Sequence, residues 1–553
     1  MEVGKITIGG LLDEMAARYP DNDALVYVEP PLRYTYQQFR DVCNQAAKGL
    51  MKIGIQKGEH ISIWANNVPE WVITQFATGK MGAVLVTVNT NYRTFELEYL
   101  LKQSDSTTLL LIAGIKGREY LDMVYELCPE LYSCAPGQLQ SARLPLLKNV
   151  IYIGPEKMPG MYNWADIMEM GRQVSDEELA ARQASLQPDE VINMQYTSGT
   201  TGFPKGVMLT HTNLIGNACS VAECMAFTHR DRMCIPVPFF HCFGCVLGTL
   251  TCVVSGATMV PVVAFHPAAV LRTVEKEKCT ALHGVPTMFI AELEELSKQK
   301  YDTSSLRTGI MAGAPCPIEV MKAVVNTMGA REICITYGQT EASPGITMTR
   351  TDDPIELRVS TVGRALPNVE VKIVNPETGE TVPPGVQGEL CTRGYHVMKG
   401  YYNMPEATAS AIDKEGWLHT GDLAVMDKSG YCKITGRLKD MIIRGGENVY
   451  PREIEEFLYT NPKIRDIQIV GVPSEKYGEE VVAFIQLKEG EQATPEEIKE
   501  FCRDKISRHK IPAYVFFVDQ YPTTASGKIQ KYKLRERAIK ELGREKAAQI
   551  ETA

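Results

Sequence analysis

The chain has 553 residues, of which 44% are hydrophobic and 23% charged, and its formal net charge is −9. This length exceeds what a single hydrophobic core usually fills, so two or more domains are expected. The acidic balance argues against non-specific nucleic-acid binding, although it leaves room for a local basic patch.

No segment of the sequence carries a membrane or export signal. No apolar run is long enough to span a bilayer, the N-terminus lacks the hydrophobic core of a signal peptide, and the C-terminus matches neither a peroxisomal nor an ER address. The 15 cysteines are scattered, which a reducing compartment tolerates. We therefore expect a cytoplasmic protein without an integral membrane segment.

Helix-like and strand-like patterns alternate through the first hundred residues. The segment 35–54 begins with Thr35 as an N-cap and places Phe39, Ala46 and Leu50 at helical spacing. The alternation continues with strand-like runs at 60–65, 83–89 and 107–113 and helix-like runs at 69–82 and 94–103. Such alternation predicts βαβ units and a mostly parallel sheet.

A second alternating region follows in the middle of the chain. Its helix-like runs cover 266–278, 287–299 and 317–328, and its strand-like runs cover 280–285 and 331–337. From about Val362 the sequence turns to short strands rich in Val, Gly and Pro, and beyond Arg437 it becomes a compact α/β stretch. We predict an α/β fold with two doubly wound sheets and a small β unit in a large N-terminal domain. A small α+β C-terminal domain would follow a boundary near residues 436–440.

The most informative segment is a glycine-rich loop, YTSGTTGFPKG, at residues 196–206. Its backbone N–H groups, hydroxyls and single cation suit phosphate oxygens. It lies between a strand-like run at 190–195 and a helix-like run at 208–217, where α/β sheets bind ligands. It is not a P-loop, because Lys205 is followed by Gly206 rather than by Ser or Thr. Taken alone, an ordinary Gly/Ser/Thr loop stays the alternative.

Four further motifs follow the loop: YGQTE at 337–341, TGD at 420–422, GRLKDMIIRGGENVYPREIEE at 436–456 and PTTASGK at 522–528. In this order the five motifs resemble the adenylate-forming superfamily of acyl-CoA synthetases, peptide-synthetase adenylation domains and luciferases. GELCTRGYHVMKGYYN and the motifs after it are most similar to medium-chain acyl-CoA synthetases. The resemblance implies that a carboxylic acid, ATP and coenzyme A give acyl-CoA, AMP and pyrophosphate through an acyl-adenylate. It also implies an adenylation domain at 1–436, a hinge at 437–440 and a mobile lid at 441–553.

The resemblance assigns the phosphates of ATP to the glycine-rich loop. The β- and γ-phosphates would be held by Thr197, Ser198, Gly199, Thr200, Thr201 and Lys205. Glu341 would bind Mg²⁺ together with Thr200, and Thr340 would donate to the α-phosphate. Such oxygen ligands are what a hard cation prefers.

The nucleoside half of ATP would meet a second group of residues. Tyr337 would stack on the adenine, and Asp422 would accept hydrogen bonds from both ribose hydroxyls, a role suited to a carboxylate. Arg437 would reach the ribose or a phosphate. The base would be lined by Gly313, Ala314, Pro315 and Gly338.

The C-terminal part would deliver the catalytic lysine. Lys528 would bridge the attacking carboxylate and the α-phosphate, whereas Lys531 and Lys533 are expected to be solvated lysines of a basic tail. Lys439 matches the hinge at which the small domain turns between the two half-reactions. In the second pose, coenzyme A would meet Gly445, Gly446, Glu447 and Asn448.

The acyl pocket is the least defined part of the prediction. Its expected residues are His241, Gly284, Val285, Gly338, Ser343 and Pro344. His241 would gate the passage between acid and nucleotide, and a histidine that caps a helix is the alternative. Acetate-specific relatives carry Trp where this chain has Gly338, so we expect space for a medium-chain, cyclic or aromatic acid. Cys242 and Cys245 have CxxC spacing, and we favour buried apolar residues over a redox or metal pair.

Two other functions stay open at this point. One is an adenylating enzyme that loads a carrier protein, and the other is a non-catalytic nucleotide-binding homologue. The expected partners are small molecules only, namely the acid, ATP and coenzyme A, with Mg²⁺ as cofactor and no nucleic acid. A homodimer is one alternative for the oligomeric state.

Overall fold

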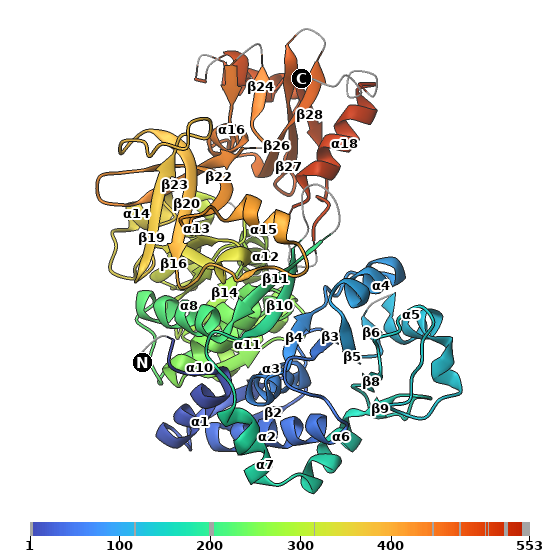
Figure 1. Cartoon of the computed structure of the whole chain (residues 1–553). Coiled ribbons are helices and arrows are strands. Elements are labelled where there is room, and N and C mark those ends of the chain that lie inside the picture. Colours follow the sequence, from blue (N-terminus) through green and yellow to red (C-terminus); the bar gives the residue numbers. More distant parts are fainter. Residues whose placement is uncertain are drawn as a thin grey trace.

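The computed structural model describes residues 4–115, 118–197, 204–314, 316–438, 440–444, 447–474, 477–503, 505–506, 508–524 and 529–544. It has a large N-terminal part built on two mixed sheets and a small C-terminal part built on another sheet (Figure 1). The predicted α/β fold class is therefore confirmed. Within the described part of the chain, every helix is too short or too polar to cross a lipid bilayer.

One large sheet carries the strands on both sides of the glycine-rich loop. It has eight strands in the order β21-β11-β10-β4-β3-β5-β8-β9, parallel from β10 to β9 and antiparallel at β10–β11 and β11–β21. The strands are β3 (His60–Trp64), β4 (Val84–Thr87), β5 (Ser106–Leu111), β8 (Asn149–Tyr152), β9 (Tyr162–Asn163), β10 (Val191–Thr197), β11 (Lys205–Thr210) and β21 (Gly400–Tyr401).

The second large sheet has nine strands in the order β18-β17-β16-β15-β14-β12-β13-β1-β2. Its centre, from β16 to β1, is parallel, and antiparallel strands close both edges. The strands are β1 (Asp23–Tyr27), β2 (Leu32–Thr35), β12 (Arg232–Ile235), β13 (Thr258–Pro261), β14 (Ala281–Gly284), β15 (Thr308–Met311), β16 (Glu332–Gly338), β17 (Gly345–Met348) and β18 (Arg364–Ala365). A separate hairpin pairs β6 (Gly114–Ile115) with β7 (Arg118–Glu119).

Helices cover and join these sheets. Thr35 caps α2 in a capping box with Gln38, as its sequence predicts, and α3 is buried from Trp71 to Met81. The helices of this part are α1 (Ile8–Arg18), α2 (Tyr36–Lys52), α3 (Pro69–Met81), α4 (Thr94–Gln103), α5 (Tyr120–Leu127), α6 (Trp164–Met170), α7 (Asp176–Ala184), α8 (His211–Cys224), α9 (Cys242–Gly244), α10 (Thr251–Ser255), α11 (Pro267–Glu277), α12 (Pro286–Lys298), α13 (Ile318–Ala323), α14 (Ile355–Ser360) and α15 (Pro405–Ala411).

One predicted helix begins later than expected. The run 208–217 was expected to be helical throughout, but residues up to Thr210 belong to β11, and α8 starts at His211. Thr210 is the N-cap of α8 in a capping box with Asn213, which fixes the switch from strand to helix.

The small β unit is an antiparallel sheet in the order β19-β20-β22-β23. Its strands are β19 (Val369–Val374), β20 (Gln387–Gly394), β22 (Leu418–Met426) and β23 (Cys432–Arg437). Its position agrees with the predicted change of character from about Val362.

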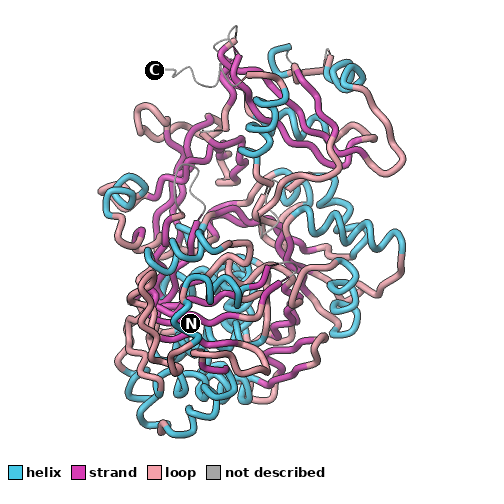
Figure 2. The backbone as a smooth tube through the Cα atoms, turned by 90° about the vertical axis from the view of Figure 1, so that its right-hand side faces the viewer, coloured by secondary structure: helices cyan, strands magenta, loops and turns pink. Residues whose placement is uncertain are grey.

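The last sheet lies at one end of the molecule in both views (Figure 1, Figure 2). Strand β27 (Gly478–Leu487) lies between β24 (Ile442–Arg444) and β26 (Ile464–Ser474), with β25 (Glu447–Val449) beyond β24, and β28 (Tyr514–Phe517) also pairs with β27. The helices of this part are α16 (Pro451–Leu458), α17 (Pro495–Cys502) and α18 (Lys531–Glu541).

Candidate active site

Two of the predicted nucleoside contacts meet at the end of β16. The hydroxyl of Tyr337 donates a hydrogen bond to Oδ2 of Asp422 at 2.7 Å, although 85 positions separate them in the chain. Asp422 lies on β22 and is only 7% exposed. Gly313 and Ala314 follow β15, the parallel neighbour of β16. Tyr337, Gly313 and Ala314 therefore lie at the carboxyl ends of adjacent parallel strands, where α/β sheets bind ligands, and Asp422 of the small β unit bonds to Tyr337 there.

A bulge in β22 aims Asp422 at Tyr337. Glu389 of β20 pairs with Leu423 and Cys391 pairs with His419, so β22 carries two more residues than β20 between these pairs. Oε1 of Glu389 fills the bulge and accepts a hydrogen bond from the N–H of Gly421 at 2.9 Å. Gly421 has φ +70°, a conformation that favours glycine. Bulges of this kind redirect a side chain beside a functional site.

Tyr401 joins two other predicted site residues. Its hydroxyl donates to Oε1 of Glu341 at 2.8 Å, and its ring centroid lies 4.5 Å from Nζ of Lys205. Burial, together with the neighbouring Glu341 carboxylate, raises the pKa of Tyr401. The residue is 7% exposed and lies on β21, opposite Val207 of β11. Tyr401 therefore holds the expected magnesium ligand and the expected phosphate-binding lysine together.

Tyr401 had no role in the sequence prediction. It belongs to the GYYN segment that carries the family resemblance, but the resemblance assigns this residue no role. In the sequence, Tyr401 stands out only as the first of two tyrosines after a glycine. That pattern does not predict that residues 400 and 401 pair with β11. Its contacts depend on residues 60 and 196 positions away.

His241 caps a helix, which was the alternative to the gate. Its Nδ1 accepts a hydrogen bond from the N–H of Phe243 at 3.1 Å at the start of α9. A neutral ring that accepts at Nδ1 carries its proton on Nε2. Sγ of Cys242 lies 3.8 Å from Oγ1 of Thr340, so His241 and Thr340 flank the same thiol. The gate stays a prediction.

Cys242 and Cys245 are buried free thiols, which agrees with the favoured interpretation. Nε2 of Gln195 donates to Sγ of Cys245 at 3.2 Å, and burial raises the pKa of that thiol. Among the described residues, neither thiol belongs to a group of three side chains that could hold a metal, and a protonated thiol is a poor nucleophile.

Gly338 does not leave the space that its sequence suggested. A Cβ added at Gly338 would lie 1.8 Å from the carbonyl oxygen of Pro344, so the backbone of the turn after β16 occupies that position. The space expected beside Gly338 is therefore filled by backbone at the Cβ position, where the glycine permits a close approach, and its place in the acyl pocket stays a prediction. Of the other acyl-pocket candidates, Val285 is buried after β14, and Oγ of Ser343 donates to the carbonyl of His396 at 2.6 Å. A Cβ at Gly284 would meet the ring of Phe289 at 2.9 Å.

Several predicted residues lie outside the described part of the chain. They are Ser198, Gly199, Thr200, Thr201, Pro315, Lys439, Gly445, Gly446 and Lys528, together with the side chains of Arg437, Glu447 and Asn448. Thr197 ends β10 and is the register partner of Lys205, so the two ends of the glycine-rich loop are adjacent. The backbone of Arg437 pairs with Asp422.

The residues on either side of Lys528 form bonds within the C-terminal part of the chain. Thr523 pairs with Ile529, and the N–H of Gln530 donates to the carbonyl of Pro522 at 2.8 Å. Nζ of Lys531 forms an ion pair with Oε1 of the buried Glu455 at 2.5 Å. The expectation of a solvated Lys531 is therefore wrong, because this lysine anchors the start of α18 to α16. Lys533 is exposed, as expected.

Sequence and structure comparisons extend over nearly the whole chain. The profile of the family described as AMP-binding enzyme matches residues 12–402, and that of the AMP-binding enzyme C-terminal domain matches residues 453–528. YngI of Bacillus subtilis (strain 168), provisionally named an acyl-CoA synthetase, is 63% identical over 96% of this chain and 97% of its own length. The mitochondrial medium-chain acyl-CoA ligase ACSF2 of Danio rerio is 45% identical over 97% of this chain and 89% of its own. A crystal structure of the anthranilate CoA ligase AuaEII with anthranoyl-AMP is 25% identical and superposes with a TM-score of 0.85, covering 97% of this chain and 98% of that one.

Proposed function

This chain belongs to the AMP-binding enzyme family and is an adenylate-forming acyl-CoA synthetase, and from that premise we propose that it activates a medium-chain carboxylic acid. ATP and coenzyme A are its co-substrates. The proposed length of the acid rests on one observation. This protein is 45% identical to a medium-chain acyl-CoA ligase over 97% of its residues. Aromatic acids are the second candidate class, because an anthranilate CoA ligase superposes on nearly the whole chain.

In the proposed reaction a carboxylate oxygen of the acid attacks the α-phosphorus of ATP, and the bond to pyrophosphate breaks. The thiol of coenzyme A then loses its proton and attacks the acyl carbonyl carbon, and AMP leaves with the electrons of the broken bond. The first step brings negative groups together, so the site must supply cations and oriented donors. We assign Lys528 to that step and Lys205, with residues 197–201, to the departing phosphates.

We assign the nucleoside to Tyr337 and Asp422. The carboxylate of Asp422 already accepts from the Tyr337 hydroxyl, and a carboxylate has sites for several further donors. The ribose hydroxyls would be such donors. The bulge held by Glu389 supports this assignment, because it fixes the backbone next to Asp422 before any ligand arrives.

The residues around Glu341 suit a bound Mg²⁺. One carboxylate oxygen of Glu341 accepts from Tyr401, and the side chain is only partly buried, so it can offer oxygen to a hard cation. Thr200 is the second proposed ligand. When bound, Mg²⁺ would neutralise charge on the phosphate oxygens. The part of this protein is to hold Glu341 still, which Tyr401 does through one hydrogen bond.

We also propose that residues 1–436 form the adenylation domain and residues 441–553 a lid that turns about Lys439. The four-stranded sheet ends at Arg437 and the last sheet begins at Ile442, so the connection between them is short. In this structure Arg465 of the last sheet forms an ion pair with Glu294 of α12 at 2.8 Å. Both side chains are well exposed, and such pairs contribute about 0–1 kcal/mol, so the contact opposes a rotation only weakly.

The test of this function is a panel of acids from acetate through octanoate to benzoate, with AMP release measured with and without coenzyme A. Each buried methylene contributes about 0.8 kcal/mol, or roughly fourfold in kcat/KM, so octanoate should exceed acetate by a wide margin. A maximum at benzoate would move the enzyme to the aromatic class. AMP release that does not depend on coenzyme A would contradict the thioester product.

A cytoplasmic location and a role in fatty acid metabolism complete the proposal. All 15 cysteines of the sequence lie in the described part of the chain, and all are free thiols, which supports a reducing compartment. A homodimer remains the alternative to a monomer, and light scattering of the purified chain decides between them.

A further inference from the structure

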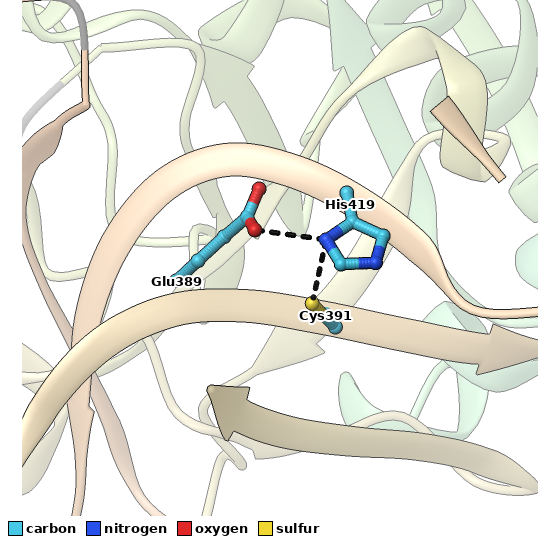
Figure 3. Close-up of side chains that lie close together, drawn as sticks. All are labelled: Glu389, Cys391 and His419. Carbon is cyan, nitrogen blue, oxygen red and sulfur yellow. Dashed lines mark hydrogen bonds and ion pairs between the residues drawn. The ribbon is translucent and has the colours of Figure 1, made fainter. Parts of the chain in front are cut away.

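Three side chains that can bind a metal meet on the small β unit, beside the bulge that carries Asp422 (Figure 3). Glu389 and Cys391 lie on β20, and His419 lies opposite Cys391 on β22. Nδ1 of His419 is 2.8 Å from Oε2 of Glu389 and 3.5 Å from Sγ of Cys391. All three donor atoms lie within 4.8 Å of one another.

This combination of nitrogen, sulfur and oxygen suits one class of cation. Zn²⁺ binds His at about 2.0–2.1 Å, Cys at about 2.3 Å and a carboxylate at about 2.0–2.2 Å in a tetrahedron. Those lengths place the His nitrogen about 3.6 Å from the Cys sulfur and about 3.4 Å from the carboxylate oxygen. The first separation is already present at 3.5 Å, and the second needs the Glu389 oxygen to withdraw from its present 2.8 Å.

Asp413 lies on the other side of the histidine ring. Its Oδ1 accepts from the N–H groups of Glu415 and Trp417 at 2.8 and 2.9 Å, which fixes the carboxylate. Its Oδ2 lies 3.7 Å from Nε2 of His419. Nδ1 now shares a hydrogen bond with Glu389, so a metal at Nδ1 requires the ring proton to be on Nε2, where the Asp413 carboxylate lies close enough to become its partner after a small shift.

The surroundings of the cluster are compatible with a cation. Lys372 is the register partner of Cys391, but its Nζ lies 4.2 Å from the ring centroid of Trp417. Arg393 stacks on the same ring at 4.5 Å. Both positive charges therefore have an aromatic partner. Burial, with the Glu389 carboxylate, raises the pKa of the Cys391 thiol to about 12, so that thiol keeps its proton until a metal displaces it.

We propose that Glu389, Cys391 and His419 form a binding site for a thiophilic divalent cation of the Zn²⁺ class, with solvent as the fourth ligand. Binding forms the metal–sulfur bond and releases the thiol proton to water. The bound ion links β20 to β22 next to the bulge, so it stabilises the folded sheet. A ligand that binds the native state and not the unfolded state raises the free energy of unfolding. The increase grows with the logarithm of the ligand concentration divided by Kd.

Titration of the whole chain with Co²⁺, followed by displacement with Zn²⁺, tests this site without ATP or Mg²⁺. The wild type should show one Co²⁺ equivalent with a thiolate charge-transfer band, and Zn²⁺ should remove the band and raise the Tm. Cys391→Ser should lose the band. His419→Gln should weaken the affinity by more than about 100-fold, and Asp413→Asn by roughly tenfold or more, as loss of an outer carboxylate usually does.

Cys432→Ser is the matched control, because Cys432 is a buried free thiol on β23 of the same sheet and should leave the band unchanged. His419 is 34% exposed in its side chain, so the His419→Gln variant should fold even if Cys391→Ser does not. Absence of the band in folded wild type overturns the proposal. A band that survives in both Cys391→Ser and His419→Gln also overturns it.

Discussion

The proposed nucleotide end of the site and the residues that flank Lys528 are held in contrasting ways. Around the nucleotide end, side chains from distant parts of the chain already bond to one another: Tyr337 to Asp422, Tyr401 to Glu341, and Glu389 to the backbone of Gly421. The residues that flank the Lys528 segment bond within the C-terminal part, where Thr523 pairs with Ile529 and Lys531 forms an ion pair with Glu455. That sheet meets α12 through an exposed ion pair.

The contrast suggests that the two regions have different functions. A rigid nucleotide end presents donors and acceptors in fixed positions, which is what electrostatic catalysis requires. A small sheet whose bonds lie mostly within itself, and whose ion pair to α12 is exposed, can turn as a unit. Substitutions in the first region should therefore reduce binding or stability, whereas substitutions in the second should separate the two half-reactions.

The largest effect is expected at Lys528. Loss of one group that stabilises the transition state typically lowers the rate about 10²–10³-fold, so Lys528→Ala should reduce adenylate formation by that factor, measured as pyrophosphate release. Thioester formation from supplied acyl-AMP should stay near the wild-type rate. Lys533→Ala, at an exposed neighbour, is the control. An equal loss in both half-reactions would contradict the assignment.

Gly338→Ala tests the rigidity of the nucleotide end. The added Cβ would lie 1.8 Å from the Pro344 carbonyl oxygen, and backbone must move to admit it. We expect the free energy of unfolding to fall by about 3 kcal/mol, at the upper end of what overpacking produces, as measured by denaturant unfolding. Gly436→Ala places its Cβ 3.7 Å from the nearest atom, in the ring of Tyr450, and should be nearly neutral. A Gly338→Ala protein as stable as wild type would show that the turn after β16 is soft.

Tyr401→Phe removes the hydrogen bond to Glu341 and keeps the ring under Lys205. Hydrogen bonds to charged groups contribute about 1.5–3 kcal/mol, so kcat/KM for ATP should fall roughly 10–100-fold. Tyr402→Phe is a matched control, because the Tyr402 hydroxyl donates to Asp105 at 2.8 Å and faces away from Glu341. If Tyr401→Phe, but not Tyr402→Phe, needs a higher Mg²⁺ concentration for half-maximal activity, Glu341 is the affected group. Equal effects of the two variants would remove Tyr401 from the site.

Two buried glutamates extend the comparison to stability. Glu455 accepts from Lys531 and from the N–H of Ile469, whereas both oxygens of Glu292 on α12 are buried without a hydrogen-bond partner among the described residues. Burial raises the pKa of Glu292 well above its usual value. In the unfolded state this carboxyl ionises at about pH 4.3. As the pH rises beyond that value, ionisation lowers the free energy of the unfolded state but not of the folded state, so the protein becomes less stable.

Glu292→Met should therefore stabilise the protein by about 1–2 kcal/mol near pH 8, with a smaller gain near pH 4, as measured by thermal unfolding. Glu455→Met should have the opposite sign, because it leaves Lys531 without its partner. A gain from Glu292→Met that does not depend on pH would mean that packing, rather than ionisation, is responsible.

The smallest effect is expected at the contact between the two regions. Arg465→Ala removes an exposed ion pair and should change stability by less than about 1 kcal/mol. If the ion pair holds the small sheet in the present pose, the ratio of the two half-reaction rates should shift by severalfold at most, measured by single-turnover kinetics. Arg503→Ala, at an exposed pair within the small domain, should leave that ratio unchanged.

Local sequence patterns predicted most of the fold, because alternating helices and strands follow from the spacing of apolar residues. They failed where one strand runs directly into a helix, since the residues up to Thr210 look helical although they pair in β11. The site residues were predicted by motif. Tyr401 and Glu389 escaped that prediction because their contacts arise from strand pairing between distant segments, and the space beside Gly338 was misjudged because the obstructing atom belongs to the backbone of Pro344.

The pairing of Thr197 with Lys205 bears on the entropy of nucleotide binding. A polypeptide loop whose ends are free must lose the entropy of closure when a ligand draws it together, and that loss grows by about 0.6 kcal/mol for each doubling of its length. Here the ends of the glycine-rich loop are joined by the β10–β11 ladder when the sheet folds. If the loop binds the phosphates as proposed, the entropy cost of bringing its two ends together is already met by the folded sheet before ATP arrives.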